Sequence, residues 1–180
     1  MRTAKDSMGV MEIPEGVLYG ASTQRAVLNF PVSGRTLPRP FLSALGQLKI
    51  SCAKANAVLG VLNKKTAAAI ASAAAKVSSG AYDSHFVVDV YQTGSGTSTN
   101  MNANEVIANL ANKALKGGKI HPNDHVNCGQ SSNDIIPTAI HVSARIEIQT
   151  RLLPALKKLH TSLKKKASSF SKVVKIGRTH

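Results

Sequence analysis

Three clusters of small hydroxyl and amide side chains in this sequence could bind a carboxylate. They are Gln92–Thr97, Gln130–Asp134 and Gly177–His180, the last at the end of the chain. Each is expected where a loop meets a helix. A helix N-terminus offers unpaired N–H groups and a partial positive charge, so it stabilises an anion without a charged side chain. The clusters therefore predict a site that holds a small carboxylate by hydrogen bonds.

A plainer interpretation stays open beside this one. Ser, Thr and Asn residues often do no more than cap the helix that they precede. Capping is sufficient to explain any one cluster taken alone. Two such clusters together with Thr179 and His180 favour a binding site, but their spacing does not decide the matter.

The segment His121–His125 places two histidines and a carboxylate within five residues. A tetrahedral zinc site would draw further Cys or His ligands at regular spacing, and Cys128 is only a weak candidate. An anion site or an ordinary polar loop fits these residues better, and no metal is expected. His141 and His160 fall within helical patterns and are expected to be packing or surface residues.

The net charge of +14 is distributed unevenly along the chain. Residues 151–180 hold nine of the 23 Lys and Arg residues and no Asp or Glu. Such an excess is typical of a basic tail, or of a helix whose acidic partners lie in other sequence or in another subunit. We favour the helix, because the segment keeps an apolar stripe at helical spacing.

The cysteines and the hydrophobic pattern indicate the compartment. Cys52 and Cys128 form no motif, as is typical of reduced thiols in an intracellular protein. No run approaches the roughly 18 apolar residues of a membrane helix. The first residues lack the apolar core of a signal peptide. We therefore expect a cytoplasmic protein with no membrane partner.

The elements that must position the clusters are mainly helices. With many Ala residues and no Trp, the composition favours helices packed through small side chains. The first forty residues are interrupted by Pro and Gly, which predicts loops and short extended pieces with little helix, and a small hairpin over Met8–Tyr19. Helices are expected over Phe41–Gly60, Lys64–Ser78 and Asn100–Leu115, the first two as an antiparallel pair.

A last, long helix is expected to follow the second cluster. Ser131–Asp134 offers several N-cap residues, and Pro137 is expected in or near the first helical turn, where its missing N–H costs little. Apolar residues continue at helical spacing as far as Phe170, with a kink at Pro154.

Four ordered segments resemble successive motifs of the class II fumarases, which belong to the fumarase/aspartase superfamily. They are Gln92–Asn102, His121–Asp124, Gln130–Asp134 with Pro137–Ala139, and Lys175–His180. Lys5–Gly9 and Tyr19–Arg25 fit as well, so the resemblance runs essentially end to end. Within the superfamily, Ser131–Asn133 and Thr93–Thr97 favour fumarase, whereas Tyr19 and His125 suit aspartases equally.

The resemblance implies reversible trans addition of water to fumarate, giving (S)-malate, as in the tricarboxylic acid cycle, without a metal or other cofactor. Removing a proton beside a carboxylate forms a dianionic aci-carboxylate that preorganised donors must stabilise. By the family pattern, His180 is the catalytic residue and acts as general acid toward the leaving hydroxyl. The substrate carboxylates would be bound by Ser95, Thr97, Ser131, Ser132, Asn133 and Thr179. A second anion site near the entrance would comprise His121, Asn123 and Asp124.

The resemblance also implies a mainly α fold and a homotetramer. Residues 1–130 would form an N-terminal, mostly helical domain with short extended segments. Residues 131–180 would begin the first long helix of a central bundle, which four subunits share and around which each active site draws on three of them. The family's general base, a serine on a mobile loop, and its substrate-binding lysine come after the position of His180. We therefore expect an N-terminal fragment that is inactive alone and, with its apolar stripe exposed, prone to aggregate.

Two alternatives remain at this stage. An ammonia-lyase of the same superfamily would perform the same elimination on aspartate. A non-catalytic scaffold or basic nucleic-acid binder would use the lysines of residues 157–166, with steep sensitivity to salt. The sequence lacks aromatic platforms and recognition motifs, so a nucleic-acid partner is not expected.

Overall fold

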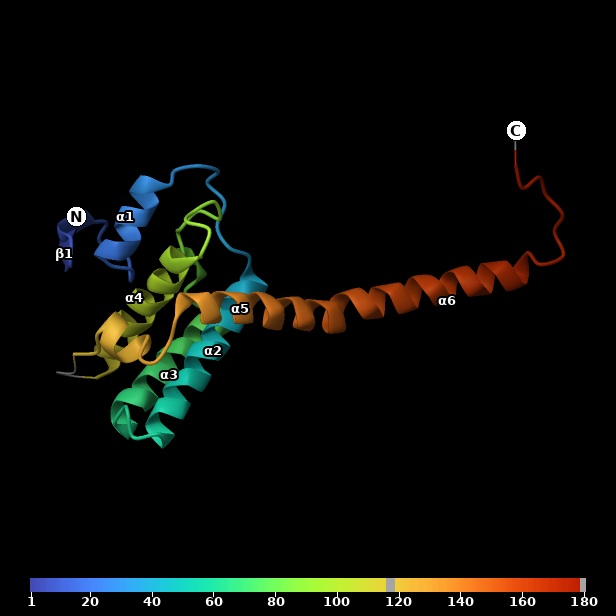
Figure 1. The fold of residues 1–180 in the computed structure, drawn as a ribbon. Helices are drawn as coiled ribbons and strands as arrows, with labels where there is room; N and C mark the ends of the chain where they lie inside the picture. Colours follow the sequence, from blue (N-terminus) through green and yellow to red (C-terminus); the bar gives the residue numbers. More distant parts are fainter. Residues whose placement is uncertain (116–118, 179–180) are drawn as a thin grey trace. The chain divides into compact units, whose positions relative to one another are not determined.

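The computed structural model describes residues 1–115 and 119–178 (Figure 1). The described chain is mainly helical, as predicted, with helices α1 to α6 and one two-stranded sheet. It divides into two compact units, Met1–Ser143 and Ala144–His180. The domain boundary predicted between residues 130 and 131 stays a prediction.

An antiparallel hairpin opens the chain. Strand β1 (Arg2–Asp6) pairs with β2 (Gly9–Ile13), with Arg2 opposite Ile13 and Asp6 opposite Gly9. The hairpin predicted over Met8–Tyr19 therefore lies earlier in the sequence. Asp6 Oδ1 accepts a hydrogen bond from Met8 N at 2.9 Å, and Gly9 supplies a positive φ of 118°. These two features close the turn at residues 7 and 8.

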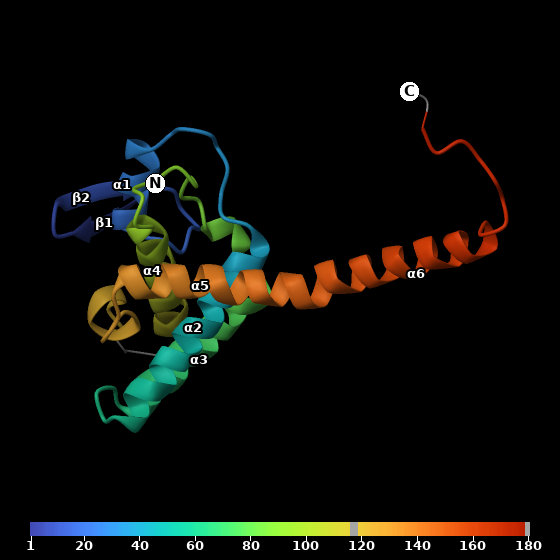
Figure 2. The same ribbon diagram turned by 45° about the vertical axis from the view of Figure 1, so that its right-hand side comes forward.

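Helix α1 (Ala21–Asn29) lies in the part of the chain that was expected to contain little helix. It packs beside the hairpin (Figure 2). No side chain of its own N-cap region caps it. Glu105 supplies the cap instead, accepting from Gly20 N at 2.8 Å, Ser22 N at 3.1 Å and Thr23 N at 3.2 Å. Because the cap comes from a distant helix, local sequence does not reveal it.

Helices α2 (Arg39–Val58) and α3 (Lys64–Ser79) form the predicted antiparallel pair and lie side by side (Figure 1). Their backbones approach closely at Gly46, where a Cβ atom would come within 2.7 Å of Ser78 N. Asn63 caps α3 by accepting from Thr66 N at 2.8 Å, and Gly80 ends it with a φ of 92°.

Helix α4 (Thr97–Ala114) packs against α3 and α1 in the core of the first unit. It begins three residues before the predicted start, and Gly117 and Gly118, its predicted end, lie outside the described residues. The aromatic and β-branched run 86–91 contributes only an isolated bridge between Thr36 and Asp89. Fully buried apolar side chains of the core include Leu45, Ile70, Val77, Val106 and Ile107.

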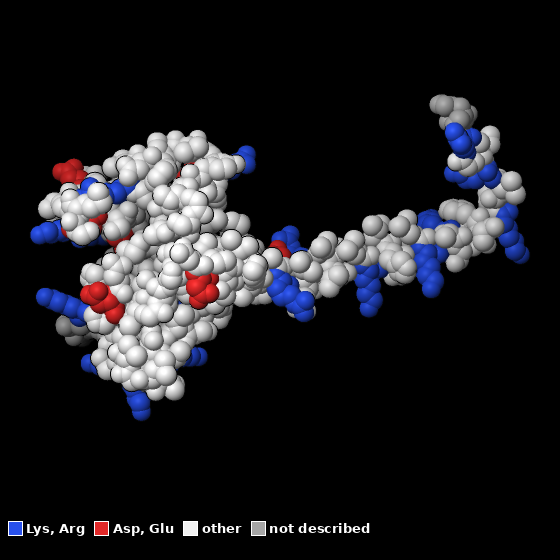
Figure 3. Space-filling model, viewed as in Figure 1, with Lys and Arg blue, Asp and Glu red and all other residues white. Residues whose placement is uncertain are grey.

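A π-helical turn, Pro122–Val126, leads to helix α5 (Ser132–Glu147). Pro137 is the sixth residue of α5 and therefore lies near the first turn, as predicted, although it is inside the helix. A π-helical segment, Ile148–Leu152, precedes α6 (Leu153–Ser169), and the irregularity predicted at Pro154 takes this form. None of the described residues 144–178 is buried, and Lys and Arg side chains far outnumber Asp and Glu along them (Figure 3).

Candidate functional site

The N-termini of α4 and α5 meet in the first unit. Asn100, in the first turns of α4, donates from Nδ2 to Oγ of Ser132, the first residue of α5, at 3.0 Å. Gly96, the N-cap of α4, lies so close to α5 that a Cβ atom there would come within 2.9 Å of Ile136 Cγ2. Two positively polarised helix ends therefore lie side by side, an arrangement that favours an anion.

The first predicted cluster forms the loop before α4. Gln92 ties this loop to the helix, because its Oε1 accepts from Thr99 N at 3.0 Å and its Nε2 donates to Thr99 Oγ1. The hydroxyl oxygens of Ser95 and Thr97 are 2.9 Å apart, and both residues are exposed. The structure thus brings these two predicted substrate ligands together at the surface.

The second cluster begins α5 and combines capping with available donors. Ser131 Oγ accepts from Asn133 N at 3.2 Å, so Ser131 acts as a cap, as the plainer interpretation expected. Ser132 Oγ accepts from Asn100, which leaves the Ser132 hydroxyl proton to be donated elsewhere. The side chain of Asn133 is exposed beside it. The third cluster cannot be compared, because Thr179 and His180 lie outside the described residues.

The predicted second anion site forms an exposed turn that satisfies many of its own polar groups. His121 N donates to His125 Nδ1 at 2.9 Å. His121 Nδ1 accepts from Asp124 N at 3.3 Å when neutral and pairs with Asp124 Oδ2, 3.1 Å away, when protonated. Asn123 is exposed. Over the described ranges, no group of three or more His, Cys, Asp or Glu side chains could hold a metal ion. The anion role of this turn stays a prediction.

Sequence reasoning missed a buried lysine beneath the second cluster. Lys49 of α2 is fully buried, and its Nζ donates to Gln130 Oε1 at 2.8 Å and to Asn127 Oδ1 at 3.2 Å. Burial lowers the pKa of Lys49 from 10.5 to about 7, and the nearby Cys52 opposes part of this shift. Burial in turn raises the pKa of the Cys52 thiol. The available signal was a charge on the apolar face of α2, four residues after Leu45.

Asn100 and Asn127 were also missed as supporting residues. Asn127 Oδ1 accepts from both Lys49 Nζ and Asn100 Nδ2, the latter at 3.0 Å. Asn127 Nδ2 donates to Gln130 O at 3.2 Å, and Gln130 Nε2 donates to Val126 O at 2.8 Å. One hydrogen-bonded network therefore joins α2, α4 and the turn that precedes α5.

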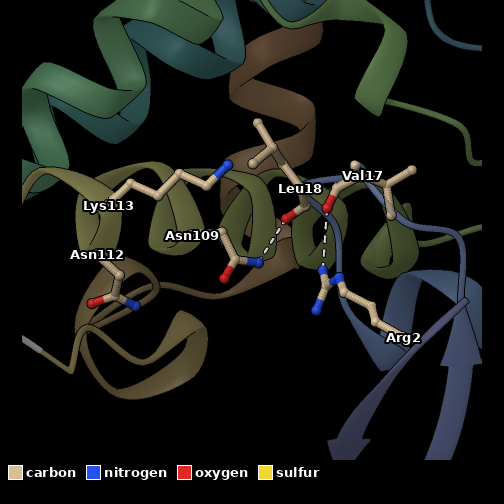
Figure 4. A pocket seen from close by; sticks show the side chains of 7 residues that line it. Arg2, Val17, Leu18, Asn109, Asn112 and Lys113 are labelled. Atoms are coloured by element: carbon tan, nitrogen blue, oxygen red, sulfur yellow. Dashed lines mark hydrogen bonds between the residues drawn. The ribbon is translucent and has the colours of Figure 1, made fainter.

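Two cavities of the first unit bear on the choice of site. One of about 200 Å³ is bordered by Gln92, Gly96, Thr99, Ile136 and Ile140, next to the first cluster. A larger one of about 430 Å³ lies between the N-terminal segment and α4 (Figure 4). Two of its polar side chains donate hydrogen bonds to backbone carbonyls of the N-terminal segment. Arg2 donates to Val17 O at 3.1 Å, and Asn109 donates to Leu18 O at 2.7 Å. It contains none of the predicted site residues.

Within the described residues, no helix combines the length and apolar character needed to span a bilayer.

Comparison with known proteins agrees with the predicted resemblance. The model of the Lyase family matches residues 9–180. A class II fumarate hydratase of Xylella fastidiosa is 58% identical over 99% of this chain and 38% of its own length. A second, from Pseudomonas aeruginosa, is 54% identical over 99% of this chain and 39% of its own length.

Solved structures show the same likeness. A recombinant class II fumarase from Schistosoma mansoni superimposes with a TM-score of 0.94 at 42% identity, covering 99% of this chain and 39% of that protein. A fumarate lyase:delta crystallin from Brucella melitensis gives 0.93 at 41% identity, covering 99% and 42% respectively. The chain thus spans about two fifths of these relatives. The predicted resemblance to class II fumarases and the mainly α fold are confirmed, and the chain belongs to the Lyase family.

Proposed function

We propose that this chain is part of a class II fumarate hydratase, a hydro-lyase that adds water reversibly to fumarate to give (S)-malate. The observation that carries the proposal is the meeting of the α4 and α5 N-termini, joined by the hydrogen bond between Asn100 and Ser132. The small hydroxyl and amide groups gathered there match a dicarboxylate in charge and in hydrogen-bonding pattern.

The site residues would act chiefly as preorganised donors. In the malate-to-fumarate direction, a base removes a proton from the carbon next to one carboxylate, and that carboxylate takes up the electron pair as an aci-carboxylate. Hydroxyl donors fixed before the reaction stabilise this dianion more than they stabilise the ground state. Ser132 suits this role because its oxygen already accepts from Asn100. Ser95, Thr97, Ser131, Asn133 and Thr179 would complete the contacts to the two carboxylates.

The second half of the elimination breaks the C–O bond. The hydroxyl leaves with its bonding electrons and takes a proton from His180, so that water departs and the double bond of fumarate forms. In the hydration direction the same residue removes a proton from the attacking water. His121, Asn123 and Asp124 would hold a dicarboxylate near the entrance before or after the reaction.

We further propose that the complete protein is a cytoplasmic homotetramer of the tricarboxylic acid cycle. Support for assembly comes from the large apolar side chains that residues 144–178 expose. They are Ile146, Ile148, Leu152, Leu153, Leu156, Leu159, Leu163, Phe170, Val173, Val174 and Ile176. Packing these apolar side chains against the same segment of other subunits would remove them from water.

The test is activity of the protein expressed from its own gene, after its intact mass has been measured. Loss of the ultraviolet absorbance of fumarate, with malate as product, is the expected result. The variant Ser132→Ala should lower kcat/KM about 100-fold, as removing one donor to a developing oxyanion does. The matched control is Ser51→Ala, at an exposed hydroxyl on α2, which should leave kcat/KM within about twofold.

The same protein assayed with malate and with aspartate distinguishes a fumarate hydratase from an aspartate ammonia-lyase. Release of ammonia from aspartate without turnover of malate would replace the proposal by an aspartate ammonia-lyase. Turnover of malate alone would support the fumarate hydratase.

A further inference from the structure

Lys49 is the charged group that the proposed reaction leaves without a role. It is fully buried, yet no carboxylate in the described part of the chain lies within ion-pair distance of its Nζ. A buried charge without a counter-ion is costly to keep and is ordinarily paired. Within the described part of the chain, Nζ donates instead to two amide oxygens, those of Asn127 and Gln130.

The Lys49 Nζ group has at least two N–H donors in either protonation state, and it donates to both amide oxygens, so it fixes the orientation of the two amides. With their oxygens held toward Nζ, Asn127 and Gln130 must point their NH₂ groups away. Those groups then donate to the backbone carbonyls of Gln130, Val126 and Cys128. The lysine thereby fixes the conformation of the turn immediately before the second cluster.

The same orientation reaches the Ser132 hydroxyl. Because Asn127 presents its oxygen, the Nδ2 group of Asn100 can donate to it at 3.0 Å. The same Nδ2 group donates to Ser132 Oγ, also at 3.0 Å. Ser132 therefore uses its oxygen as an acceptor inside the protein and keeps its proton for an outside acceptor. Hydrogen bonds thus connect Lys49 to Ser132: Asn127 Oδ1 accepts from both Lys49 Nζ and Asn100 Nδ2, and Asn100 Nδ2 also donates to Ser132 Oγ.

We propose that Lys49 is a positioning residue of the dicarboxylate site, which acts through Asn127 and Asn100 to present the Ser132 hydroxyl as a hydrogen-bond donor. The inference rests on the proposed function for the identity of the ligand. It goes beyond that function because it gives Lys49, a buried residue of α2, a role in orienting the Ser132 hydroxyl at the start of α5.

The test is a double-mutant cycle between Lys49→Met and Ser132→Ala in the protein expressed from its own gene. Methionine has a similar length and removes the buried charge, so the variant is expected to fold. Lys49→Met should raise the dissociation constant for succinate, an unreactive dicarboxylate, and the KM for fumarate about tenfold. In the Ser132→Ala background it should change either value by less than about twofold, because its route to the ligand has been removed.

Two further variants separate positioning from a purely structural role. Lys54→Met, at an exposed lysine on the same helix, is the matched control and should leave succinate affinity within about twofold of the wild type. Asn127→Leu keeps Lys49 but breaks the connection to Asn100, and it should reproduce the loss seen with Lys49→Met. It also keeps the inference testable if Lys49→Met fails to fold.

The outcomes distinguish the two proposals. Tight succinate binding without turnover of fumarate would remove the proposed function, while a non-additive cycle would still support Lys49 as a positioning residue. Additive losses in the cycle, unchanged affinity in Lys49→Met, or no dicarboxylate binding by the wild type would each overturn the inference.

Discussion

The two compact units of this chain differ in which side chains they bury and which they expose. Residues 1–143 bury polar groups such as Asn100, Asn102 and Glu105, whereas the described residues 144–178 leave large apolar groups such as Leu156 and Leu159 exposed. In the first unit, hydrogen-bond partners stabilise the buried Asn102 amide and the buried Glu105 carboxylate. In the described part of the second unit, apolar side chains also recur at helical spacing, but none of them is buried in a core. A stripe of apolar residues at helical spacing therefore predicts a helix. The stripe stabilises the fold only where another segment packs against it.

Two amide side chains of α4, the buried Asn102 and the partly buried Asn112, show how hydrogen bonds stabilise polar groups in the first unit. Asn102 accepts from Val87 N at 3.2 Å and donates to His85 O at 2.9 Å. Asn112 accepts from Ile120 N at 2.7 Å and donates to Ile120 O at 2.9 Å. Each amide thus satisfies the backbone of a segment that forms no sheet, and a single helix holds the irregular segments around the candidate site.

The largest expected difference between the units comes from one substitution made in both. Leu45→Ala, at a fully buried position of α2, should lower the free energy of unfolding by about 3 kcal/mol, because it removes packed methyl groups and leaves a cavity. Leu159→Ala, at a position of α6 that is 55% exposed, should change it by less than about 0.5 kcal/mol.

Urea unfolding followed by circular dichroism measures both values. At raised protein concentration, Leu159→Ala should instead weaken self-association, which sedimentation would detect. Equal destabilisation of dilute protein by the two changes would contradict the contrast between the units.

A backbone substitution tests the junction of α4 and α5. Gly96→Ala should lower the free energy of unfolding by about 2 kcal/mol, because Gly96 has a φ of 67° and a methyl group would press on Ile136. Gly94→Ala is the matched control: its Cβ would meet no heavy atom within 4 Å, and its φ lies outside the strained range. Thermal unfolding of both variants makes the comparison. A similar Tm for the two would show that the two helix ends are not closely packed.

The buried lysine makes the stability of the first unit depend on pH. Lys49 loses its proton at about pH 7 when folded and near 10.5 when unfolded, so the unfolded chain binds more protons between these values. The free energy of unfolding should therefore rise with pH in this window by about 1.4 kcal/mol per pH unit from this group. Below about pH 7 the burial penalty is fully present.

Lys49→Met removes this contribution, so the variant should exceed the wild type in stability at pH 6 and lose that advantage as the pH rises toward 10. Lys54→Met, at an exposed lysine of the same helix, is the control for the loss of a lysine from α2. Urea titrations at several pH values measure the slopes. Parallel slopes for wild type and Lys49→Met would mean that the folded lysine titrates normally.

Local signals predicted α2, α3 and α4, because each has an apolar face together with Gly, Pro or Asn residues at its ends. They failed for α1, whose cap, Glu105, is more than eighty residues away. They also failed for the hairpin, where the side chain of Asp6 determined which residues form the turn. Elements stabilised by distant contacts are those that local patterns miss.

The residues of the candidate site also fall into two groups, those that the sequence predicted and those that only the structure revealed. Hydroxyl and amide clusters before α4 and α5 were visible in the sequence, and Ser95, Thr97, Ser131, Ser132 and Asn133 lie at those helix starts. Lys49, Asn100 and Asn127 were not identified, since their role depends on hydrogen bonds between three separate segments. Periodicity marks Lys49 only as an anomaly on an apolar face. Its partners become known only from the tertiary structure.

The smallest expected effects come from one ion pair in each unit. Arg25 contacts Asp6 through Nε at 2.9 Å and Nη2 at 3.2 Å, and both side chains are largely shielded from water. Arg151 contacts Glu147 at 2.8 Å one helical turn away, with 76% of its own side chain exposed. Arg25→Ala should lower the free energy of unfolding by about 1 kcal/mol. Arg151→Ala should lower it by less than about 0.5 kcal/mol, because solvent screens the exposed pair.

Urea unfolding at low and high salt distinguishes these two pairs from each other. Added salt should shrink the effect of Arg151→Ala toward zero and leave most of the effect of Arg25→Ala, since a shielded pair with two aligned hydrogen bonds is screened less. If both effects fell equally with salt, the Arg25 pair would be energetically a surface pair. The distinction between a unit that shields its polar contacts and one that exposes them would then hold for amides but not for charges.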